Sequence, residues 1–387
     1  MHPPIKRIAT GIDIGTHSTR VVIVEHARGE APIVVGTGSA ESRGIKRGYI
    51  SNKAEAMKSI NSAVAHAEKM AGYKIRNAFL SIGGISLEST ISHGCATISR
   101  ASGEIGEQDL AKAQENAESK LNNLLNKKII HRTAIRYDLD GKEILGDPIG
   151  KIGEKVEIKM LFVTCLTQHL EDVIKTIEDI GIEVDEVVPS PVAAGNIALS
   201  KKQRGVGCAL VNIGAETVSI AVFENDIPIS LQVFPIGSTD ITNDIALGLK
   251  IPLEEAEKIK ESGPLGVYPK KKLEEIIEAR LYDIFELIES HLKKIKRNGL
   301  LPAGIVLTGG GAGIATIEDL AKAVLKLPSS IATPIHGADS KKPVKDASWV
   351  VAYGLCIYGL NKPEEETPNI TGEILTSVKN WFKQFLP

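Results

Sequence analysis

A glycine turn between two apolar strands occurs twice in this sequence, and the repeat restricts the fold more than any other feature. In the first copy, residues 8–14 form an apolar strand, Gly15 opens a polar turn, and residues 19–25 are rich in β-branched side chains. The second copy spans residues 209–224 and has the same layout. The equivalent positions are Asp13 and Asn212, Gly15 and Gly214, and Ser18 and Thr217. The repeat predicts two similar half-molecules that face each other across a cleft.

Each turn has the chemistry of a phosphate site. Glycine permits a sharp turn and leaves space for a ligand. The backbone N–H groups and hydroxyls that follow it form a nest of donors that suits phosphate. Mg²⁺ prefers carboxylate oxygen and retained water, so Asp13 is a candidate metal ligand, with Asn212 at the equivalent position. Taken alone, either copy also fits an ordinary β-hairpin, because short glycine motifs match by chance.

A third glycine motif follows an apolar strand at residues 304–308. Its turn consists of Gly309, Gly310, Gly311 and Ala312. A helix is expected to open soon afterwards, at Ile317. A flexible backbone next to a helix N-terminus suits the ribose, base or phosphate of a nucleotide. The third motif therefore predicts the remaining wall of the cleft.

Composition limits the class of protein. A chain of 387 residues is long enough for two or more domains with their own cores. The net charge of −2 and the 4% aromatic content argue against nucleic-acid binding. The four cysteines lie far apart in apolar runs, which predicts buried free thiols in a reducing compartment; they are Cys95, Cys165, Cys208 and Cys356. We find neither a signal peptide nor an apolar run long enough to span a bilayer, so we expect a cytoplasmic protein.

Hydrophobic periodicity gives a coarse order of elements. In the first half the pattern predicts a strand at 33–39, a basic glycine-punctuated loop at 41–50, a helix at 52–71 and a strand at 78–84. Residues 85–164 are expected to form an inserted α+β unit, with strands at 86–98, 129–138 and 156–164, a helix at 106–126 and a polar excursion at 141–153.

The rest of the chain continues as a second α/β half. The predicted elements are a helix at 169–180, a strand and turn at 184–191, a helix at 192–199, a basic hinge at 201–205, a strand at 233–238 and helices at 239–249, 253–260 and 273–297. A largely apolar helix at 348–360 is expected to pack back on the first half, and its length indicates a core helix.

The end of the chain has the pattern of a membrane-binding helix. Residues 363–369 form an acidic linker bracketed by prolines, which predicts disorder. Apolar side chains then recur at helical spacing at Ile374, Leu375, Val378, Trp381, Phe382, Phe385 and Leu386. Lys379 and Lys383 lie beside or opposite that face. Such a helix suits a membrane interface, and the alternative is a helix that docks on the protein body or on a partner.

The three glycine motifs, in this order, resemble the actin/Hsp70/sugar-kinase ATPase superfamily. The insertion at 85–164 combined with the amphipathic tail resembles the FtsA family of actin-like bacterial cell-division proteins. The resemblance implies an α/β actin-like (ribonuclease H-like) fold with two halves around a nucleotide cleft. The expected subdomains are 1A (1–84 and 165–200), 1C (85–164), 2A (201–249 and 298–360), 2B (250–297), a flexible linker (361–371) and a membrane-targeting helix (372–387).

The resemblance also implies ligands and partners. They are ATP and Mg²⁺ between the halves, further copies of the chain in filaments, the C-terminal peptide of FtsZ on 2B, later division proteins on 1C, and membrane lipids on the tail. In this superfamily the helix at 253–260 faces the nucleoside, which assigns Glu257 and Lys260 to the site; a solvated surface ion pair is the alternative. The implied location is the cytoplasmic face of the membrane at the division site.

The implied nucleotide-binding residues come from all of these segments. They are Asp13, Gly15, Thr16, His17, Ser18, Asn212, Gly214, Ala215, Glu216, Thr217, Gly237, Glu257, Lys260, Gly309, Gly310, Gly311 and Ala312. The metal ligands among them are Asp13 and Asn212.

The second hairpin departs from the family pattern, which usually reads Asp-Ile-Gly-Gly-Gly-Thr. Here Asn212 replaces the aspartate, and Ala215 and Glu216 replace two glycines. The Glu216 carboxylate costs Coulomb energy beside phosphate unless it points away or neighbours the metal. Residues 190–192 also lack the Glu or Gln that orients water in some relatives. We therefore expect ATP binding with little or no hydrolysis, no catalytic residue, and a nucleotide that favours one domain closure.

Two other functions fit parts of the sequence. An adaptor of type IV pilus assembly that resembles PilM shares the fold and the insertion but needs no lipid-binding helix. A sugar or acetate kinase shares the superfamily fold, but no catalytic base stands out near either hairpin.

Overall fold

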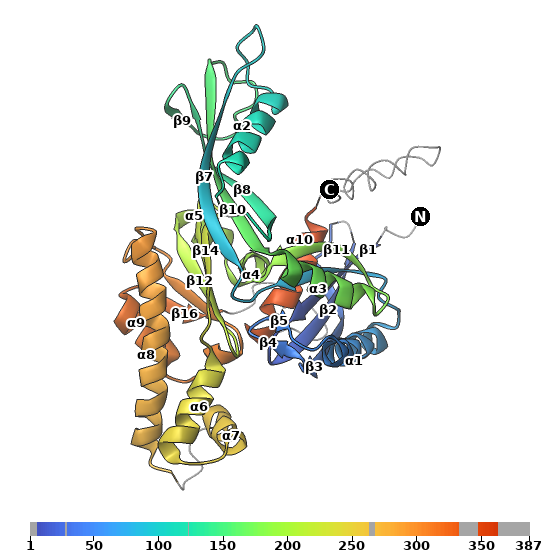
Figure 1. Ribbon diagram of the computed structural model, residues 1–387, viewed down its shortest axis with the longest axis vertical. Coiled ribbons are helices and arrows are strands. Elements are labelled where there is room, and N and C mark those ends of the chain that lie inside the picture. Colours follow the sequence, from blue (N-terminus) through green and yellow to red (C-terminus); the bar gives the residue numbers. More distant parts are fainter. Residues whose placement is uncertain (1–5, 28, 123, 263–267, 333–346, 363–387) are drawn as a thin grey trace.

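Two α/β halves and an elongated additional unit make up the computed structural model of the chain (Figure 1). It describes residues 6–27, 29–122, 124–262, 268–332 and 347–362. The strands form two large sheets and one two-stranded hairpin. The predicted tail at 372–387 and the acidic linker at 363–369 lie outside the described residues.

The first half is built on a five-stranded sheet with the order β11-β6-β1-β2-β3. Its strands are β1 (Lys6–Ile14), β2 (Ser18–Ala27), β3 (Ile33–Glu41), β6 (Asn77–Ile82) and β11 (Glu183–Pro189). The first three run antiparallel, and β6 runs parallel to both β1 and β11. The expected strands at 33–39 and 78–84 are thus confirmed.

Both faces of this sheet are covered, which explains the continuous apolar run in β2. Val21 and Ile23 pack with helices α1 (Lys53–Ala71) and α3 (Thr167–Glu178). Val22 and Val24 pack on the opposite face with α4 (Ser190–Ala198) and α10 (Val350–Leu360). The first half is therefore a three-layer sandwich.

Helix α1 illustrates how local sequence sets an element's limits. The Asn52 side chain accepts a hydrogen bond from the Glu55 backbone N–H at 3.2 Å, which caps the helix start. Gly72 ends the helix with φ 84°, a left-handed conformation that glycine adopts without strain. The helix predicted at 52–71 is confirmed.

The inserted unit has its own core, as predicted. It contains β7 (Glu88–Thr97), α2 (Glu107–Ser119), β8 (Lys127–Leu139), β9 (Lys142–Ile144) and β10 (Lys155–Leu166). Alternate residues of β10, from Val156 to Phe162, pack beneath α2. Helix α2 ends at Ser119 rather than at 126, where Asn126 takes a left-handed φ of 58° that is incompatible with a continuing helix.

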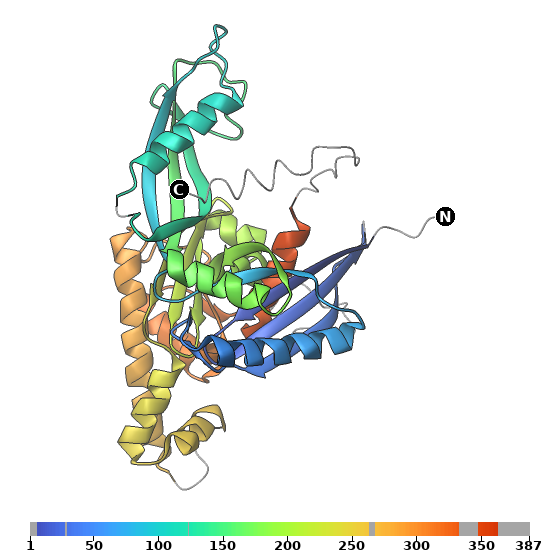
Figure 2. The ribbon, with the colours of Figure 1, turned by 45° about the vertical axis from the view of Figure 1, so that its right-hand side comes forward.

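The second half and the inserted unit share one nine-stranded sheet, with the order β16-β15-β12-β13-β14-β7-β10-β8-β9. The junction is narrow, since β14 pairs with β7 only between Gln232 and Glu88. Ser89 supports the junction, because its hydroxyl donates to the Leu231 carbonyl at 2.7 Å and accepts from the Leu231 N–H at 2.8 Å. In both views the inserted unit projects from one end of the second half (Figures 1 and 2).

The second half contains β12 (Cys208–Ile213), β13 (Val218–Glu224), β14 (Ile227–Phe234), β15 (Ile305–Thr308) and β16 (Ser329–Ile331). Its helices are α6 (Ser238–Leu249), α7 (Leu253–Ser262), α8 (Lys270–Lys294) and α9 (Ile317–Leu325). The strand expected at 233–238 instead occupies Ile227–Phe234, and β16 was not predicted.

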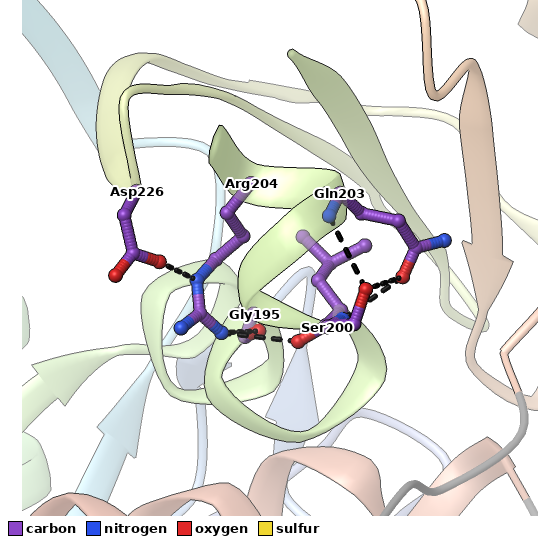
Figure 3. A network of polar contacts seen from close by, with 6 residues as sticks. Gly195, Ser200, Gln203, Arg204 and Asp226 are labelled. Atoms are coloured by element: carbon purple, nitrogen blue, oxygen red, sulfur yellow. Dashed lines mark hydrogen bonds and ion pairs between the residues drawn. The ribbon is translucent and has the colours of Figure 1, made fainter. Parts of the chain in front are cut away.

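Residues 201–205, which the sequence predicts as a basic hinge, form most of a short helix, α5 (Lys201–Val206). Ser200 and Gln203 cap its start reciprocally. The Arg204 guanidinium donates to the carbonyl oxygens of Gly195 at 3.1 Å and Leu199 at 3.0 Å, and pairs with Asp226 at 2.6 Å (Figure 3). The crossing between the halves is therefore a short helix braced by these contacts.

Helix α10 returns to the first half, as predicted. A one-turn 3₁₀ helix, Ala347–Trp349, precedes it. It packs between β1 and α4 so closely that a Cβ at Gly11 would clash with the Ala352 carbonyl oxygen, and one at Gly354 with that of Ala193. Glycine is therefore required at both crossings.

The cysteines match their prediction in part. All four are free, and Cys165, Cys208 and Cys356 are buried, while Cys95 is half-buried. In the parts of the chain that the structure describes, we find no helix long and apolar enough to cross a bilayer.

Candidate functional site

The two glycine turns have the same local geometry. A Cβ at Gly15 would lie 2.8 Å from the Ser18 carbonyl oxygen, and one at Gly214 would lie 2.9 Å from the Thr217 carbonyl oxygen. In each hairpin four residues separate the last paired positions, which are Ile14 and Thr19 in the first and Ile213 and Val218 in the second. The internal repeat read from the sequence is thus also a repeat of backbone structure.

Asp13 lies at the end of β1, where its carboxylate accepts a hydrogen bond from the Ser81 hydroxyl at 2.6 Å. Burial raises the pKa of Asp13, and the Ser81 hydrogen bond and the Arg20 charge oppose that rise only in part. Arg20 is its register partner on β2. A divalent cation beside this carboxylate would favour its charged form.

Ser18 supplies a polar atom that the protein does not satisfy. Its residue is 8% exposed, and its Oγ has no hydrogen-bond partner among the described residues. Buried hydroxyls almost always have a partner in native proteins. An oxygen-rich ligand in the first turn would provide one, so this residue fits a bound phosphate.

A small hairpin within the predicted basic loop covers the first turn. It consists of β4 (Ile45–Lys46) and β5 (Tyr49–Ile50). The Gly48 N–H donates to Thr16 Oγ1 at 3.1 Å, and the Ser42 N–H donates to the His17 carbonyl at 2.9 Å. The loop at 41–50 is therefore part of the site's wall.

The second turn contacts this hairpin across the cleft. Glu216 Oε2 accepts a hydrogen bond from the Arg47 N–H at 2.6 Å. The carboxylate therefore points toward the first half, which is one of the two arrangements that would relieve its repulsion of phosphate. Gly237 lies against the same turn, where the Thr239 N–H donates to the Ala215 carbonyl at 2.8 Å.

The third glycine motif lies beside the second turn. Gly309 has φ 89°, and a Cβ there would clash with Asn212 Oδ1, so the asparagine amide packs directly on this glycine. Gly310 begins a 3₁₀ turn, Gly310–Gly313, and has open space around its Cα. Asn212 and Thr308 are paired neighbours on β12 and β15.

Helix α7 forms another wall. Lys260 Nζ donates to Glu257 at 2.8 Å, to Thr242 Oγ1 at 2.9 Å and to the Ser238 carbonyl at 3.2 Å. Thr242 also donates to Glu257. The Lys260 side chain is only 9% exposed and that of Glu257 is 36% exposed, so the lysine is buried against α6 while the glutamate is partly open to solvent.

Glu257 lines a hollow between α6 and α7, together with Thr239, Thr242, Asn243 and Leu253. Burial alone would raise the pKa of Glu257, but hydrogen bonds from Lys260 and Thr242 outweigh it and lower the pKa below its usual value. The charges of Lys260 and of His17 lower it further. The Lys260 ammonium donates to the Ser238 carbonyl, and the Ser238 N–H donates to the Gly214 carbonyl at 2.9 Å, so α7 lies next to the second turn.

The structure thus brings together the predicted residues of both turns, Gly237, the 309–312 loop and the α7 pair. In the described ranges we find no group of three or more His, Cys, Asp or Glu side chains arranged to hold a metal. Mg²⁺ held through Asp13 would need water and phosphate oxygens for its remaining positions. Sequence reasoning missed Ser81, Thr242 and the Arg47 N–H, because each reaches the site through a contact between distant segments.

Comparisons with known proteins agree with this architecture. A family model described as cell division protein FtsA matches residues 209–354, and one described as the SHS2 domain inserted in FTSA matches residues 84–164. Among solved structures, the chain is similar in fold to a PilM-PilN type IV pilus biogenesis complex, with TM-score 0.71 and 16% identity over 93% of this chain and 100% of that one. MreB5 of Spiroplasma citri bound to ADP gives TM-score 0.52 and 12% identity over 91% and 96%.

Two curated relatives extend the match along most of the chain. Cell division protein FtsA of Pseudomonas aeruginosa is 29% identical over 93% of this chain and 91% of its own length. Cell division protein FtsA of Bacillus subtilis is 30% identical over 89% of this chain and 81% of its own length. Together with the actin-like fold, this similarity establishes that the chain belongs to the FtsA family of cell-division proteins.

Proposed function

We propose that this chain binds ATP with Mg²⁺ in the cleft between its halves and hydrolyses it slowly or not at all. One observation carries the proposal: two turns of the same geometry, one from each half, meet through the 44–50 hairpin next to a glycine loop. Such turns present backbone donors that suit phosphate. MreB5 of Spiroplasma citri, which has a similar fold, has been solved with ADP.

The chain's own residues have distinct roles in this proposal. The hydroxyl of Ser18 and the N–H groups of the two turns bind phosphate oxygens, and Asp13 and Asn212 hold the hydrated Mg²⁺. Bound Mg²⁺ neutralises phosphate charge. The α7 pair and the glycines from Gly309 onward bind the nucleoside.

Slow hydrolysis follows from the start of α4. Residues 190–192 offer no carboxylate or amide to orient an attacking water. Of their side chains, only the Ser190 hydroxyl is polar. Phosphate release at the rate of a brisk actin-like ATPase would contradict this part of the proposal.

Equilibrium titration with a fluorescent ATP analogue and Mg²⁺ tests the binding site. We expect Asp13→Asn to weaken binding at least tenfold when Mg²⁺ is present and to change it little when EDTA removes Mg²⁺, because only the metal needs the carboxylate charge. Asp319→Ala, on the exposed start of α9, is the matched control and should bind like the unaltered chain. Equal binding by both variants with Mg²⁺ would refute the role of Asp13.

At the level of the cell, we infer that the chain anchors FtsZ filaments to the cytoplasmic face of the membrane at the division site. Family membership supports this inference. In this proposal, subdomain 2B (residues 250–297) binds the FtsZ C-terminal peptide, and subdomain 1C (85–164) binds later division proteins. Head-to-tail contacts between copies of the chain form filaments. The amphipathic pattern at 372–387 supplies the lipid contact, and filament formation strengthens it through many weak tails.

Hydrogen bonds and an ion pair hold the end of α10 against the first half. Arg7 Nη1 donates to the Leu360 carbonyl at 3.1 Å, and Tyr358 donates to Glu186 at 2.7 Å. Lys362 pairs with the same glutamate. The end of α10 and Lys362 therefore lie beside β11.

Co-sedimentation with anionic liposomes tests the membrane proposal, using the full chain and a chain that ends at Asn361, each with and without ATP. We expect pelleting that needs the tail and increases with ATP. If neither protein pellets, the tail is a docking helix, and the pilus-type adaptor becomes the better account.

A further inference from the structure

The tip of the 44–50 hairpin adopts an uncommon backbone conformation. Its turn joins paired residues Lys46 and Tyr49 through two residues, Arg47 with φ 51° and Gly48 with φ 83°. A two-residue turn with both φ values positive suits the twist of a hairpin and favours Asn-Gly or Gly-Gly. Arginine is disfavoured at the first of these positions because its Cβ crowds the backbone in this region. A disfavoured conformation that persists is supported by its surroundings.

The hairpin is fixed to the first half. Besides the bond from the Gly48 N–H to Thr16, His169 Nε2 donates to the Gly48 carbonyl at 3.1 Å. The His169 ring also stacks on Tyr49 at 4.3 Å between centroids. Its Nδ1 lies 3.1 Å from the Ser86 hydroxyl and accepts from it in this tautomer. The Arg47 N–H is therefore held in one direction, toward the second half.

The acceptor is equally well held on the other side. Glu216 lies in the turn between β12 and β13, which is braced by hydrogen bonds from the Ser238 N–H to the Gly214 carbonyl at 2.9 Å and from the Thr239 N–H to the Ala215 carbonyl at 2.8 Å. The bond from the Arg47 N–H to the Glu216 carboxylate is solvent-exposed, so its contribution is that of one ordinary hydrogen bond. Among the described residues, the Arg47 guanidinium forms no ion pair with this carboxylate.

We propose that Glu216 is a cross-cleft clasp: its carboxylate holds the Arg47 N–H and so joins the two halves at the phosphate end of the cleft. Neither glycine nor alanine at this position would supply an acceptor. The clasp joins two rigidly supported turns, so breaking it lets the hairpin and the second turn separate. The inference goes beyond nucleotide binding, because the clasp forms from the chain's own atoms.

Hydrogen exchange of the full chain, measured by mass spectrometry without nucleotide, tests the clasp directly. In Glu216→Ala we expect exchange of the segment at 44–50 to rise roughly threefold to tenfold, the range that corresponds to the net free energy of one hydrogen bond. Glu216→Gln keeps an acceptor without the charge, so exchange of the segment at 44–50 should rise less in this variant. Asp319→Ala, in the same half, should leave this segment unchanged.

Arg47→Gly separates the backbone from the side chain. Glycine keeps the N–H and adopts the positive φ without strain, so this variant should remain protected at 44–50 and should lose protection when combined with Glu216→Ala. Unchanged exchange at 44–50 in Glu216→Ala would overturn the proposal. So would an equal rise throughout the first half, since that result indicates general destabilisation. Because no nucleotide is added, a failure of ATP binding does not affect the measurement.

Discussion

His291 should make helix α8 sensitive to mild acid. The residue is 8% exposed, its Nε2 lies 3.0 Å from Ser230 Oγ on β14, and its ring packs edge-on against Phe234. Burial, helped by the Lys294 charge, lowers the pKa of His291 from 6.5 to about 4. The folded state therefore holds this imidazole neutral at a pH where the unfolded chain protonates it.

The size of the effect follows from linkage. Because the folded pKa lies below the unfolded value, the unfolded state binds more protons between pH 6.5 and pH 4, and stability falls as the pH decreases through that window. For these two pKa values the loss between pH 7 and pH 5 is about 2 kcal/mol.

Hydrogen exchange of peptides from α8, corrected for the intrinsic exchange rate at each pH, measures this loss as a local opening free energy. His291→Gln keeps a polar nitrogen near Ser230 but does not titrate. The opening free energy of α8 in this variant should therefore fall by about 2 kcal/mol less than in the unaltered chain over the same pH range. The comparison separates the pH effect of His291 from that of other buried histidines, such as His169, whose pKa is also lowered by burial. Identical pH dependence in the two proteins would refute the reasoning.

Two further predictions concern the packing between the halves and are tested by scanning calorimetry. Gly354→Ala should lower the unfolding temperature, at a cost of about 1–3 kcal/mol, because the added Cβ meets the Ala193 carbonyl. In Gly205→Ala, within α5, the added Cβ meets open space, so this variant should raise the unfolding temperature slightly. Arg204→Ala leaves two carbonyl oxygens without their donor and should cost about 2 kcal/mol, whereas Asp226→Ala removes one partner and should cost about 1 kcal/mol or less. Equal losses for the last two variants would contradict the proposed importance of the carbonyl contacts.

Local patterns predicted much of the fold. The apolar run of β2 and the capping residues of α1 are local signals, and the helix and strands they predict are present. Residues 201–205, predicted as a basic hinge, are mostly helical. Ser200 and Gln203 have the spacing of a capping box, and this signal was readable in the sequence. The start of β14 at Ile227 was also readable, from the alternation of Ile227, Ile229, Leu231 and Val233.

The candidate site could be predicted from the sequence only in part. Each glycine turn is a short motif, so its position could be predicted from neighbouring residues. The contact between Glu216 and Arg47 joins residues 169 positions apart, and nothing local specifies it. The same holds for Ser81 and Asp13, which meet because β6 pairs with β1. Sequence reasoning identified a problem at Glu216, namely a carboxylate near the expected phosphate, and the arrangement of the two halves supplies the solution.

The Arg204 junction and the Glu216 clasp together limit how far a nucleotide can change the closure of the two halves. A ligand shifts a conformational equilibrium only by the difference between its affinities for the two states. In this chain the Arg204 network braces the crossing between the halves, and on our proposal the Glu216 clasp favours closure at the opposite end of β12. On our proposal the clasp adds to the closed population before ATP binds, which leaves ATP a smaller population to shift. We expect ATP to change the closure of the two halves more in Glu216→Ala than in the unaltered chain. Without the clasp, closure depends more on the bound nucleotide.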